Sequence, residues 1–253
     1  MIFLRSLLFN VLFFVWLFSY LTVCLPVLFL PRTYGVKVAK IGGQGVLWLC
    51  EYVMGIHLNL VGYENLPKTP VIVASKHQST WETMAFFDFL VNPTIVLKRE
   101  LAWIPVFGWY VKGLGMLTVA RSRGQSSKDF KKFLHKAAQA VQRGEQILIF
   151  PEGTRSLPGQ KGIYHSGVSS LYMSLDIPVV PVAHNAGVFW PRRGFLKKPG
   201  MLTLEFLPPI QPGLSRQEFM RTLEEKIESR SQTLFREATL AEHNGDVKRV
   251  FSF

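Results

Sequence analysis

Residues 71–82 read VIVASKHQSTWE. The first four are apolar and predict a buried strand, and the polar residues after them predict a loop that leads into a helix. His77 stands in this loop, and Glu82 in the first turn of the helix would lie beside it. An imidazole can take a hydroxyl proton, and a carboxylate on its other nitrogen fixes its tautomer. The stretch predicts a base and its orienting acid, unless His77 only closes a strand and Glu82 only caps a helix.

A second polar loop follows the apolar strand at 147–149 and reads FPEGTRS from 150 to 156. Gly153 allows a close approach of the backbone, and Arg155 offers a rigid fork for bidentate contact with phosphate. Glu152 can hold that fork or meet a substrate hydroxyl. The plainer alternative is a turn with Arg155 in a surface ion pair. Two such loops after apolar strands indicate one shared site.

A basic pair, Lys98 and Arg99, closes another strand and precedes an aromatic segment with Pro and Gly. Cationic groups above an apolar surface suit a phosphate that carries an acyl tail. The aromatic residues of this segment are equally typical of an ordinary core or a membrane interface; they are Trp103, Phe107 and Trp109.

The composition excludes a disordered chain, because 48% of the 253 residues are hydrophobic and only 18% are charged. This length accommodates one α/β domain with a short appendage. The formal net charge of +12 indicates affinity either for nucleic acid or for anionic membranes and substrates. Arg121 and Arg123 add two cations near a strand end, where a solvated basic loop is equally plausible.

The N-terminal segment decides between these partners. Residues 6–30 carry no charged side chain, and about 20 apolar residues suffice to cross a bilayer. The segment is too long for a cleaved signal peptide, so we expect it to be retained. Pro26 also allows a helix that bends back instead of crossing. The cations after it (Arg32, Lys37 and Lys40) place the domain on the cytoplasmic side, at the inner membrane in a bacterium. We therefore expect membrane lipids, and no nucleic acid, as partners.

We predict an N-terminal helical membrane anchor at 1–57, a catalytic domain at 58–240 and a frayed tail at 241–253. The anchor comprises the apolar segment, a glycine-bearing link at 32–45 and a second helix at 46–57. The domain pattern predicts an α/β fold with a mixed sheet flanked by helices. Expected helices lie at 126–142 and 215–237, and expected strands at 71–74, 94–97, 116–119, 147–150, 179–182 and 202–206.

The side chains predict no metal site and no cofactor. Cys24 and Cys50 lie in apolar surroundings without metal-ligand or disulfide spacing, which is typical of buried, inert thiols. The six histidines show no ligand-like pairing.

Four ordered blocks between about residues 70 and 185 give the chain a resemblance to the 1-acyl-sn-glycerol-3-phosphate acyltransferase family of membrane glycerolipid acyltransferases. The His-x4-acid block matches at His77 and Glu82, and the Phe-Pro-Glu-Gly-Thr-Arg-Ser block is complete at 150–156. The other two blocks match at Lys98, Leu101, Pro105 and Gly108, and at Val180, Pro181 and Val182. Two departures are Glu82, where the family usually has Asp, and Lys76, where it commonly has Asn.

The resemblance implies a role for each matching residue. His77 would be the general base and Glu82 its orienting partner. Lys98 or Arg99 would bind the substrate phosphate together with Arg155. The acceptor site would be shaped and supported by Glu152, Gly153, Thr154 and Pro181.

The resemblance also implies a reaction in phospholipid biosynthesis. An acyl group would pass from acyl-CoA or acyl-carrier protein to the sn-2 hydroxyl of lysophosphatidic acid, giving phosphatidic acid. The alternatives are a related enzyme with another acceptor (glycerol 3-phosphate, a lyso-ornithine lipid or another lysophospholipid) and a non-catalytic membrane-binding protein. Acyl-chain preference, choice of donor, oligomeric state and crossing versus re-entry stay open at this point.

Overall fold

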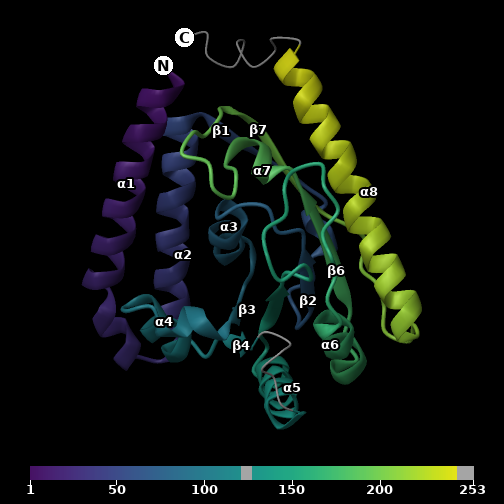
Figure 1. Cartoon of the computed structure of the whole chain (residues 1–253). Coiled ribbons are helices and arrows are strands. Elements are labelled where there is room, and N and C mark those ends of the chain that lie inside the picture. The colour runs from purple at the N-terminus through teal and green to yellow at the C-terminus, as the bar shows by residue number, and fades with distance from the viewer. Residues whose placement is uncertain (121–126, 244–253) are drawn as a thin grey trace.

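The computed structural model describes residues 1–120 and 127–243, and its described strands form one seven-stranded sheet (Figure 1). The strand order is β1-β7-β6-β2-β5-β3-β4. All neighbouring pairs are parallel except β6 and β7, which are antiparallel, so the predicted mixed sheet is confirmed. The strands are β1 (Ile56–Val61), β2 (Ile72–Ser75), β3 (Pro93–Lys98), β4 (Leu117–Val119), β5 (Gln146–Ile149), β6 (Val179–His184) and β7 (Gly200–Phe206).

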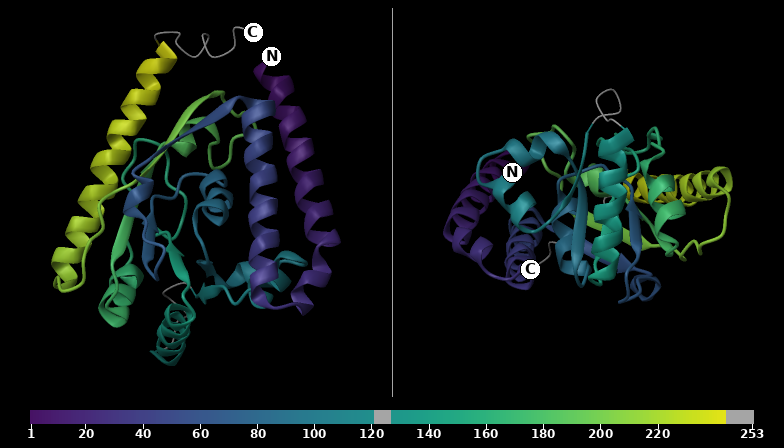
Figure 2. Two further views of the ribbon diagram at one scale, coloured as in Figure 1. Left: turned by 180° about the vertical axis from the view of Figure 1, so that it is seen from behind. Right: turned by 90° about the horizontal axis from the view of Figure 1, so that it is seen from below.

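Helices cover both faces of this sheet (Figure 2). Strand β2 shows why, because Val73 packs into one buried apolar cluster while Ile72 and Ala74 pack into another. The first cluster lies under α1 (Ile2–Val23), α2 (Arg32–Leu49), α3 (Trp81–Phe89) and α4 (Phe107–Gly113), and the second under α5 (Ser127–Gln142), α6 (Gly167–Leu175) and α8 (Arg216–His243). A short α7 (Ala186–Phe189) follows β6. At β2 the sheet is therefore apolar on both sides, and the polar residues follow the end of the strand.

The long helices of the domain agree with the sequence pattern. Helix α5 has the predicted extent apart from Ser126, which lies outside the described residues, as do Arg121 and Arg123. Gly144 follows it with φ +74°, a conformation suited to a helix end. Helix α8 continues to His243 and buries four apolar residues of the predicted helix: Phe219, Leu223, Ile227 and Leu234. Helix α8 thus extends three residues into the predicted tail at 241–253, and 244–253 lie outside the described residues.

The N-terminal region is a helical hairpin. Helix α1 ends before a 3-10 turn at Leu25–Phe29, with Pro26 at its start, and α2 then runs back beside α1 (Figure 1). The expected link at 32–45 was therefore wrong, because these residues are helical. Its glycines permit close helix packing: a Cβ at Gly42, Gly43 or Gly45 would lie within 3 Å of Tyr20, Met84 or Trp16.

The helix expected at 46–57 was wrong at its C-terminal end. The helical turns stop at Gly55, which has φ +71°, and Ile56 begins β1. β1 pairs in parallel with β7, with Ile56 level with Gly200. The alternation of apolar and polar residues in IHLNLV is the strand signal that the helical interpretation missed.

Polar contacts fix the hairpin to the domain. The Arg32 guanidinium lies 3.4 Å from the buried carboxylate of Glu145, and Lys40 donates to the carbonyl of Asp88. Near the other end, Ser6 Oγ accepts a hydrogen bond from the Lys197 N–H. Among the described residues, α1 is the one helix long and apolar enough to cross a membrane. Most of its apolar side chains are exposed, Phe18 by 68%.

Candidate active site

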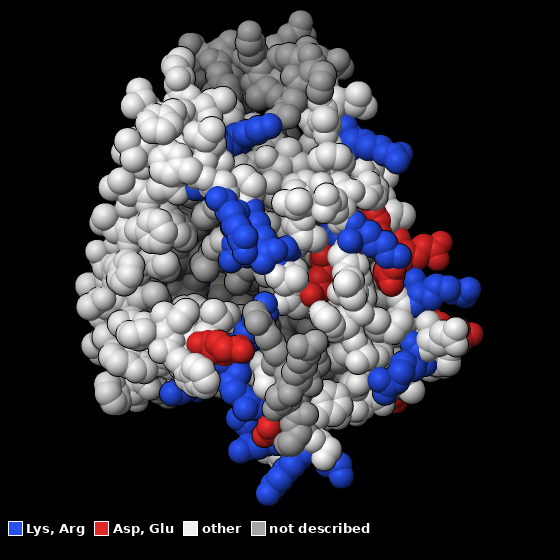
Figure 3. Space-filling view, viewed as in Figure 1, with Lys and Arg blue, Asp and Glu red and all other residues white. Residues whose placement is uncertain are grey.

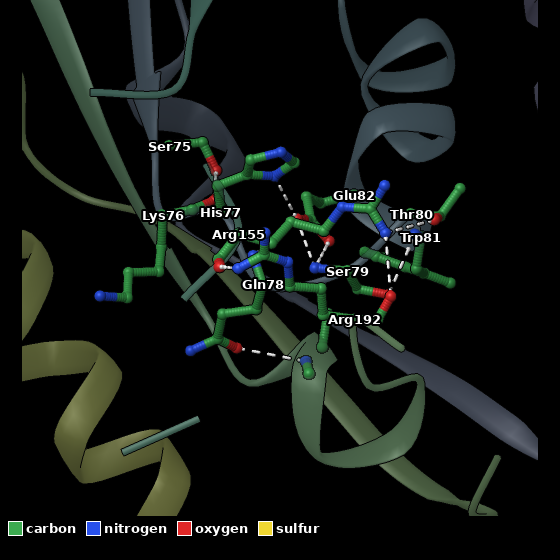
Figure 4. Close-up of polar contacts among 12 residues, drawn as sticks. Ser75, Lys76, His77, Gln78, Ser79, Thr80, Trp81, Glu82, Arg155 and Arg192 are labelled. Carbon is green, nitrogen blue, oxygen red and sulfur yellow. Dashed lines mark hydrogen bonds and ion pairs between the residues drawn. The ribbon is translucent and has the colours of Figure 1, made fainter. Parts of the chain in front are cut away.

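The loop between β2 and α3 carries the predicted base and acid (Figure 4). His77 Nδ1 lies 2.9 Å from Glu82 Oε1, so the predicted pairing of these side chains is confirmed. The same oxygen accepts the N–H groups of Gln78 and Ser79, each at 2.8 Å. Glu82 thus closes the loop around its own carboxylate, in the first turn of α3, where a negative charge is favoured.

The Glu82 carboxyl is fully buried. Burial alone would raise its pKa, but the neighbouring His184 and His77 rings and the Ser79 N–H lower the pKa below its ordinary value. A buried carboxylate in this setting can accept an Nδ1 proton from His77 and can stabilise an imidazolium. The β2–α3 loop therefore surrounds a carboxylate whose charged form is favoured.

The His77 ring has one nitrogen left for substrate. It stacks on Phe150 with ring centroids 4.1 Å apart, and 17% of its side chain is exposed. Because Glu82 occupies Nδ1, the ring presents Nε2 on its opposite side, and no described residue hydrogen-bonds to that atom. Nε2 can therefore accept a proton from an external hydroxyl.

The second loop, between β5 and α6, holds the backbone of His77. Ser156 N–H donates to the His77 carbonyl at 2.8 Å, and Glu152 Oε1 accepts the His77 N–H at 3.0 Å. The carboxyl ends of β2 and β5 adjoin in the sheet, which brings the loops together. The prediction that both loops share one site is confirmed in its geometry.

Glu152 contacts different partners from those expected. It lies on His77 and Lys76, not on the Arg155 fork, with its Oε2 3.3 Å from Lys76 Nζ. Burial raises the pKa of the Glu152 carboxyl, and the Lys76 ammonium only partly offsets this. A side chain at Gly162 would collide with the Glu152 carboxylate. Glu152 therefore supports the loop between β2 and α3 from its buried side.

Lys76 is a buried cation that the sequence marked only as a departure from the family pattern. Its side chain points away from His77 toward α8 (Figure 4). Nζ lies 2.7 Å from Glu228 Oε1 and donates to the Gln160 carbonyl at 3.1 Å. Its side chain is 1% exposed. The residue before the base thus ties the loop to the last helix.

His184, at the end of β6, is a second residue that sequence reasoning missed. It is fully buried and bonds through Nε2 to the Lys76 carbonyl at 2.8 Å, while Nδ1 accepts the Ala186 N–H. Burial lowers the pKa of His184, and the neighbouring Glu82 carboxylate only partly offsets this. The place of His184 two residues after the Val-Pro-Val block, on the strand beside β2, is the signal that could have pointed to it.

Arg155 lies beside the catalytic loop. Its Nη1 donates to Thr80 Oγ1 at 3.1 Å, and Arg192, which the sequence did not single out, donates to the Arg155 carbonyl at 2.7 Å (Figure 4). Gly153 has φ +60° and packs against His165, and Thr154 is exposed. This side of the loop therefore presents two guanidinium groups.

The remaining predicted residues lie further from His77. Lys98 ends β3, one strand beyond β5, and Arg99 pairs with Asp129 at 3.5 Å. Pro181 is buried in β6, level with Ala74 of β2, where it forms part of the sheet rather than the site surface. Within the described residues, no group of three His, Cys, Asp or Glu side chains is placed to hold a metal ion.

The site is thus a histidine–carboxylate pair at the carboxyl edge of a mixed α/β sheet. A family model described as Acyltransferase matches residues 57–185, the segment that contains both loops. The chain belongs to this acyltransferase family. A crystal structure of the 1-acyl-sn-glycerophosphate (LPA) acyltransferase PlsC from Thermotoga maritima has the same fold, with a TM-score of 0.75 and 24% identity over 92% of this chain and 98% of that one.

Two curated relatives are similar in sequence. A 1-acyl-sn-glycerol-3-phosphate acyltransferase of Pseudomonas aeruginosa is 39% identical over 65% of this chain and 63% of its own length. A protein of the same name from Saccharomyces cerevisiae is 32% identical over 63% of this chain and 54% of its own length. The chain thus spans less than two thirds of either relative.

Proposed function

We propose that this protein transfers an acyl group from acyl-CoA or acyl-carrier protein to the sn-2 hydroxyl of 1-acyl-sn-glycerol 3-phosphate, giving phosphatidic acid. The observation that carries the proposal is the His77–Glu82 pair, with Nε2 accessible and Nδ1 held at 2.9 Å by a buried carboxylate. The names of the two similar relatives support the choice of acceptor.

In this mechanism His77 Nε2 takes the proton of the acceptor hydroxyl as its oxygen attacks the thioester carbonyl. The new C–O bond forms, the C–S bond breaks, and the imidazolium returns the proton to the leaving thiolate. Glu82 stabilises the transient imidazolium without leaving its N–H donors. A thioester is already activated, so no covalent acyl-enzyme is required.

Cationic groups near the base would hold the acceptor phosphate. Arg155 is the best placed, because its guanidinium contacts Thr80, within the loop that joins His77 to Glu82. Lys98 ends the strand next to β5 and would approach from the other side. Arg99 already pairs with Asp129, which makes it the weaker of the two basic candidates on β3.

We further propose that the hairpin enters one leaflet, with the domain on the cytoplasmic surface where thioester donors are available. The N-terminal half of α1 packs on the domain through Ser6 and Lys197. A straight crossing by α1 would draw Lys197 and the basic residues near it into hydrocarbon, which costs several kcal/mol per charge. The reversal at Pro26 and the exposed apolar residues of α1 suit a re-entrant anchor instead.

The test is an acyltransfer assay on the purified, detergent-solubilised protein and on His77→Ala. Acyl-CoA and acyl-carrier protein are offered with lysophosphatidic acid, glycerol 3-phosphate, a lyso-ornithine lipid and another lysophospholipid. We expect phosphatidic acid from the unmutated protein and a loss of about 10²- to 10⁴-fold in His77→Ala, the usual contribution of general base catalysis. Circular dichroism checks that the variant is folded.

Each other outcome contradicts a defined part of the proposal. Product from a different acceptor alone would retain the mechanism and replace the substrate. Undiminished turnover in His77→Ala would contradict the assignment of His77 as the general base. The absence of product with every acceptor would favour a non-catalytic membrane-binding protein.

A further inference from the structure

The loop between α7 and β7 connects the membrane anchor with the active site. Residues 190–199 read WPRRGFLKKP, with four cations and no acidic residue. Neither the family blocks nor the matched segment 57–185 includes this loop. Its contacts at both ends give it a function beyond connecting two elements.

One end of the loop is docked on α1. Lys197 is buried, donates its N–H to Ser6 Oγ at 3.0 Å, and places its ammonium on Asn10. The Phe195 ring lies 5.5 Å from the Phe3 ring. Both rings stay substantially exposed, Phe195 by 46% and Phe3 by 59%. The exposed apolar surface of the anchor thus continues onto the loop.

The other end of the loop contacts the active site. Arg192 Nη1 donates to the Arg155 carbonyl at 2.7 Å, and Arg155 Nη1 donates back to the Arg192 carbonyl at 3.4 Å. Arg155 also contacts Thr80, between His77 and Glu82. The loop therefore places a second guanidinium beside the one that the sequence had assigned to phosphate.

These two cations have only neutral partners. Within the described part of the chain, the acceptors of Arg155 and Arg192 are two backbone carbonyls and the Thr80 hydroxyl, and no carboxylate pairs with either side chain. Each guanidinium donates to the backbone carbonyl of the other residue, so the two cations belong to one small cluster, and charge-assisted hydrogen bonds from both would favour an anion there. Figure 3, which has the same view as Figure 1, shows Lys and Arg side chains near the middle of the face in view, with uncharged surface beside them.

On the basis of the proposed function, we propose that Arg192 joins Arg155 in binding the phosphate of the lipid acceptor at the membrane surface. The ligand chemistry is a phosphate monoester, whose charge of about −1.5 to −2 matches two guanidinium groups. The acyl donor also carries phosphates, but the docking of this loop on α1 places the pair next to the bilayer. The acceptor headgroup, which stays at that level, is therefore the source that fits.

The experiment compares Arg192→Gln with Arg193→Gln, which removes an equal charge from the next exposed position of the same loop. KM is measured separately for lysophosphatidic acid and for the acyl donor. We expect Arg192→Gln to raise the lysophosphatidic acid KM about tenfold or more while the donor KM changes by less than about twofold. Arg193→Gln should change neither constant by more than about twofold.

A binding measurement provides a readout without turnover. In a His77→Ala background, binding to phosphatidylcholine vesicles is compared with and without lysophosphatidic acid. Arg192→Gln should abolish the gain from lysophosphatidic acid and leave binding to plain vesicles unchanged, which also shows that the variant is folded.

An unchanged acceptor KM in Arg192→Gln, a rise in the donor KM alone, or an equal effect of Arg193→Gln would each overturn the assignment. An unmutated protein that makes no phosphatidic acid would instead refute the proposed function. The two failures are therefore distinguishable.

Discussion

Glu82 gives the first prediction at the scale of a residue. Its carboxylate accepts from His77, Gln78 and Ser79, and no amide can accept all of these bonds without turning an N–H toward another N–H. We expect Glu82→Gln to lower kcat about 10²- to 10⁴-fold, because the imidazolium loses its counter-charge. Glu82→Asp should retain more activity than Gln. A Gln variant with near-normal kcat in the same assay would contradict this role.

Lys76 gives the second prediction. Lys76→Met would leave Glu228 and Glu152 without the cation that they share, and breaking a buried ion pair from one side costs about 3–5 kcal/mol. We expect a loss of that size in urea unfolding, with thermal unfolding shifted to match. The double variant Lys76→Met/Glu228→Gln should recover much of it. Equal losses in the single and the double variant would exclude the pairing as the cause.

The motifs located the candidate catalytic pair but not the buried residues behind it. His77 and Glu82 could be paired from the sequence because five positions and one helical turn fix their geometry. Lys76 and Glu228 are 152 positions apart, and His184 and Lys76 are 108 apart. Only the packing of α8 and β6 against β2 brings such residues together, and no local pattern records that packing.

At the scale of elements, the glycines of α2 allow a third prediction. A Cβ on Gly43 would lie 2.8 Å from the Met84 carbonyl of α3, the helix that carries Glu82. We expect Gly43→Ala to displace α3, to cost about 1–3 kcal/mol and to lower kcat. Gly167→Ala, at the start of α6, is the matched control, because a Cβ there meets nothing within 4 Å. Equal stability and activity of the two variants would argue against tight α2–α3 packing.

The same glycines explain the main error of the sequence interpretation. Glycine and basic residues at 32–45 are typical of a linker, and the low helix propensity of glycine favours one. Packing overrides propensity here, because the missing side chains let α2 approach its neighbours closely. The six strands that the sequence did identify were apolar runs, whereas β1 is half exposed, and the predicted helix at 46–57 overlaps its first two residues.

At the scale of the whole molecule, His184 makes stability depend on pH. Burial holds the pKa of His184 below its ordinary 6.5, so the unfolded chain takes up a proton that the folded chain refuses. Its contribution is present above pH 6.5 and is lost as the pH falls through that value, by up to about 1.4 kcal/mol per unit. We expect His184→Gln to remove this loss between pH 7.5 and 5.5 in urea unfolding. The exposed His135→Gln should keep it, and identical pH profiles for the two variants would refute the effect.

Membrane attachment is a second property of the whole molecule. Phe14 and Phe18 on α1 are 54% and 68% exposed. Burying each ring in lipid is worth about 1.5–3 kcal/mol, so Phe14→Asp/Phe18→Asp should weaken vesicle flotation at least about tenfold. Met173→Asp, on α6 across the sheet, should leave flotation unchanged. Normal flotation of the double variant would place the attachment elsewhere.

The pairing of Lys76 with Glu228 affects the order in which contacts form while the chain is being synthesised. The anchor leaves the ribosome first and can reach the bilayer early, but the catalytic loop receives the counter-charge from Glu228 only when α8 emerges. Until then Lys76 has no Glu228 to meet, and the β2–α3 loop lacks one of its fastenings. If His77, Arg155 and Arg192 act as proposed, a nascent chain would hold all three before the β2–α3 loop is fully fastened, and full activity would follow the emergence of α8.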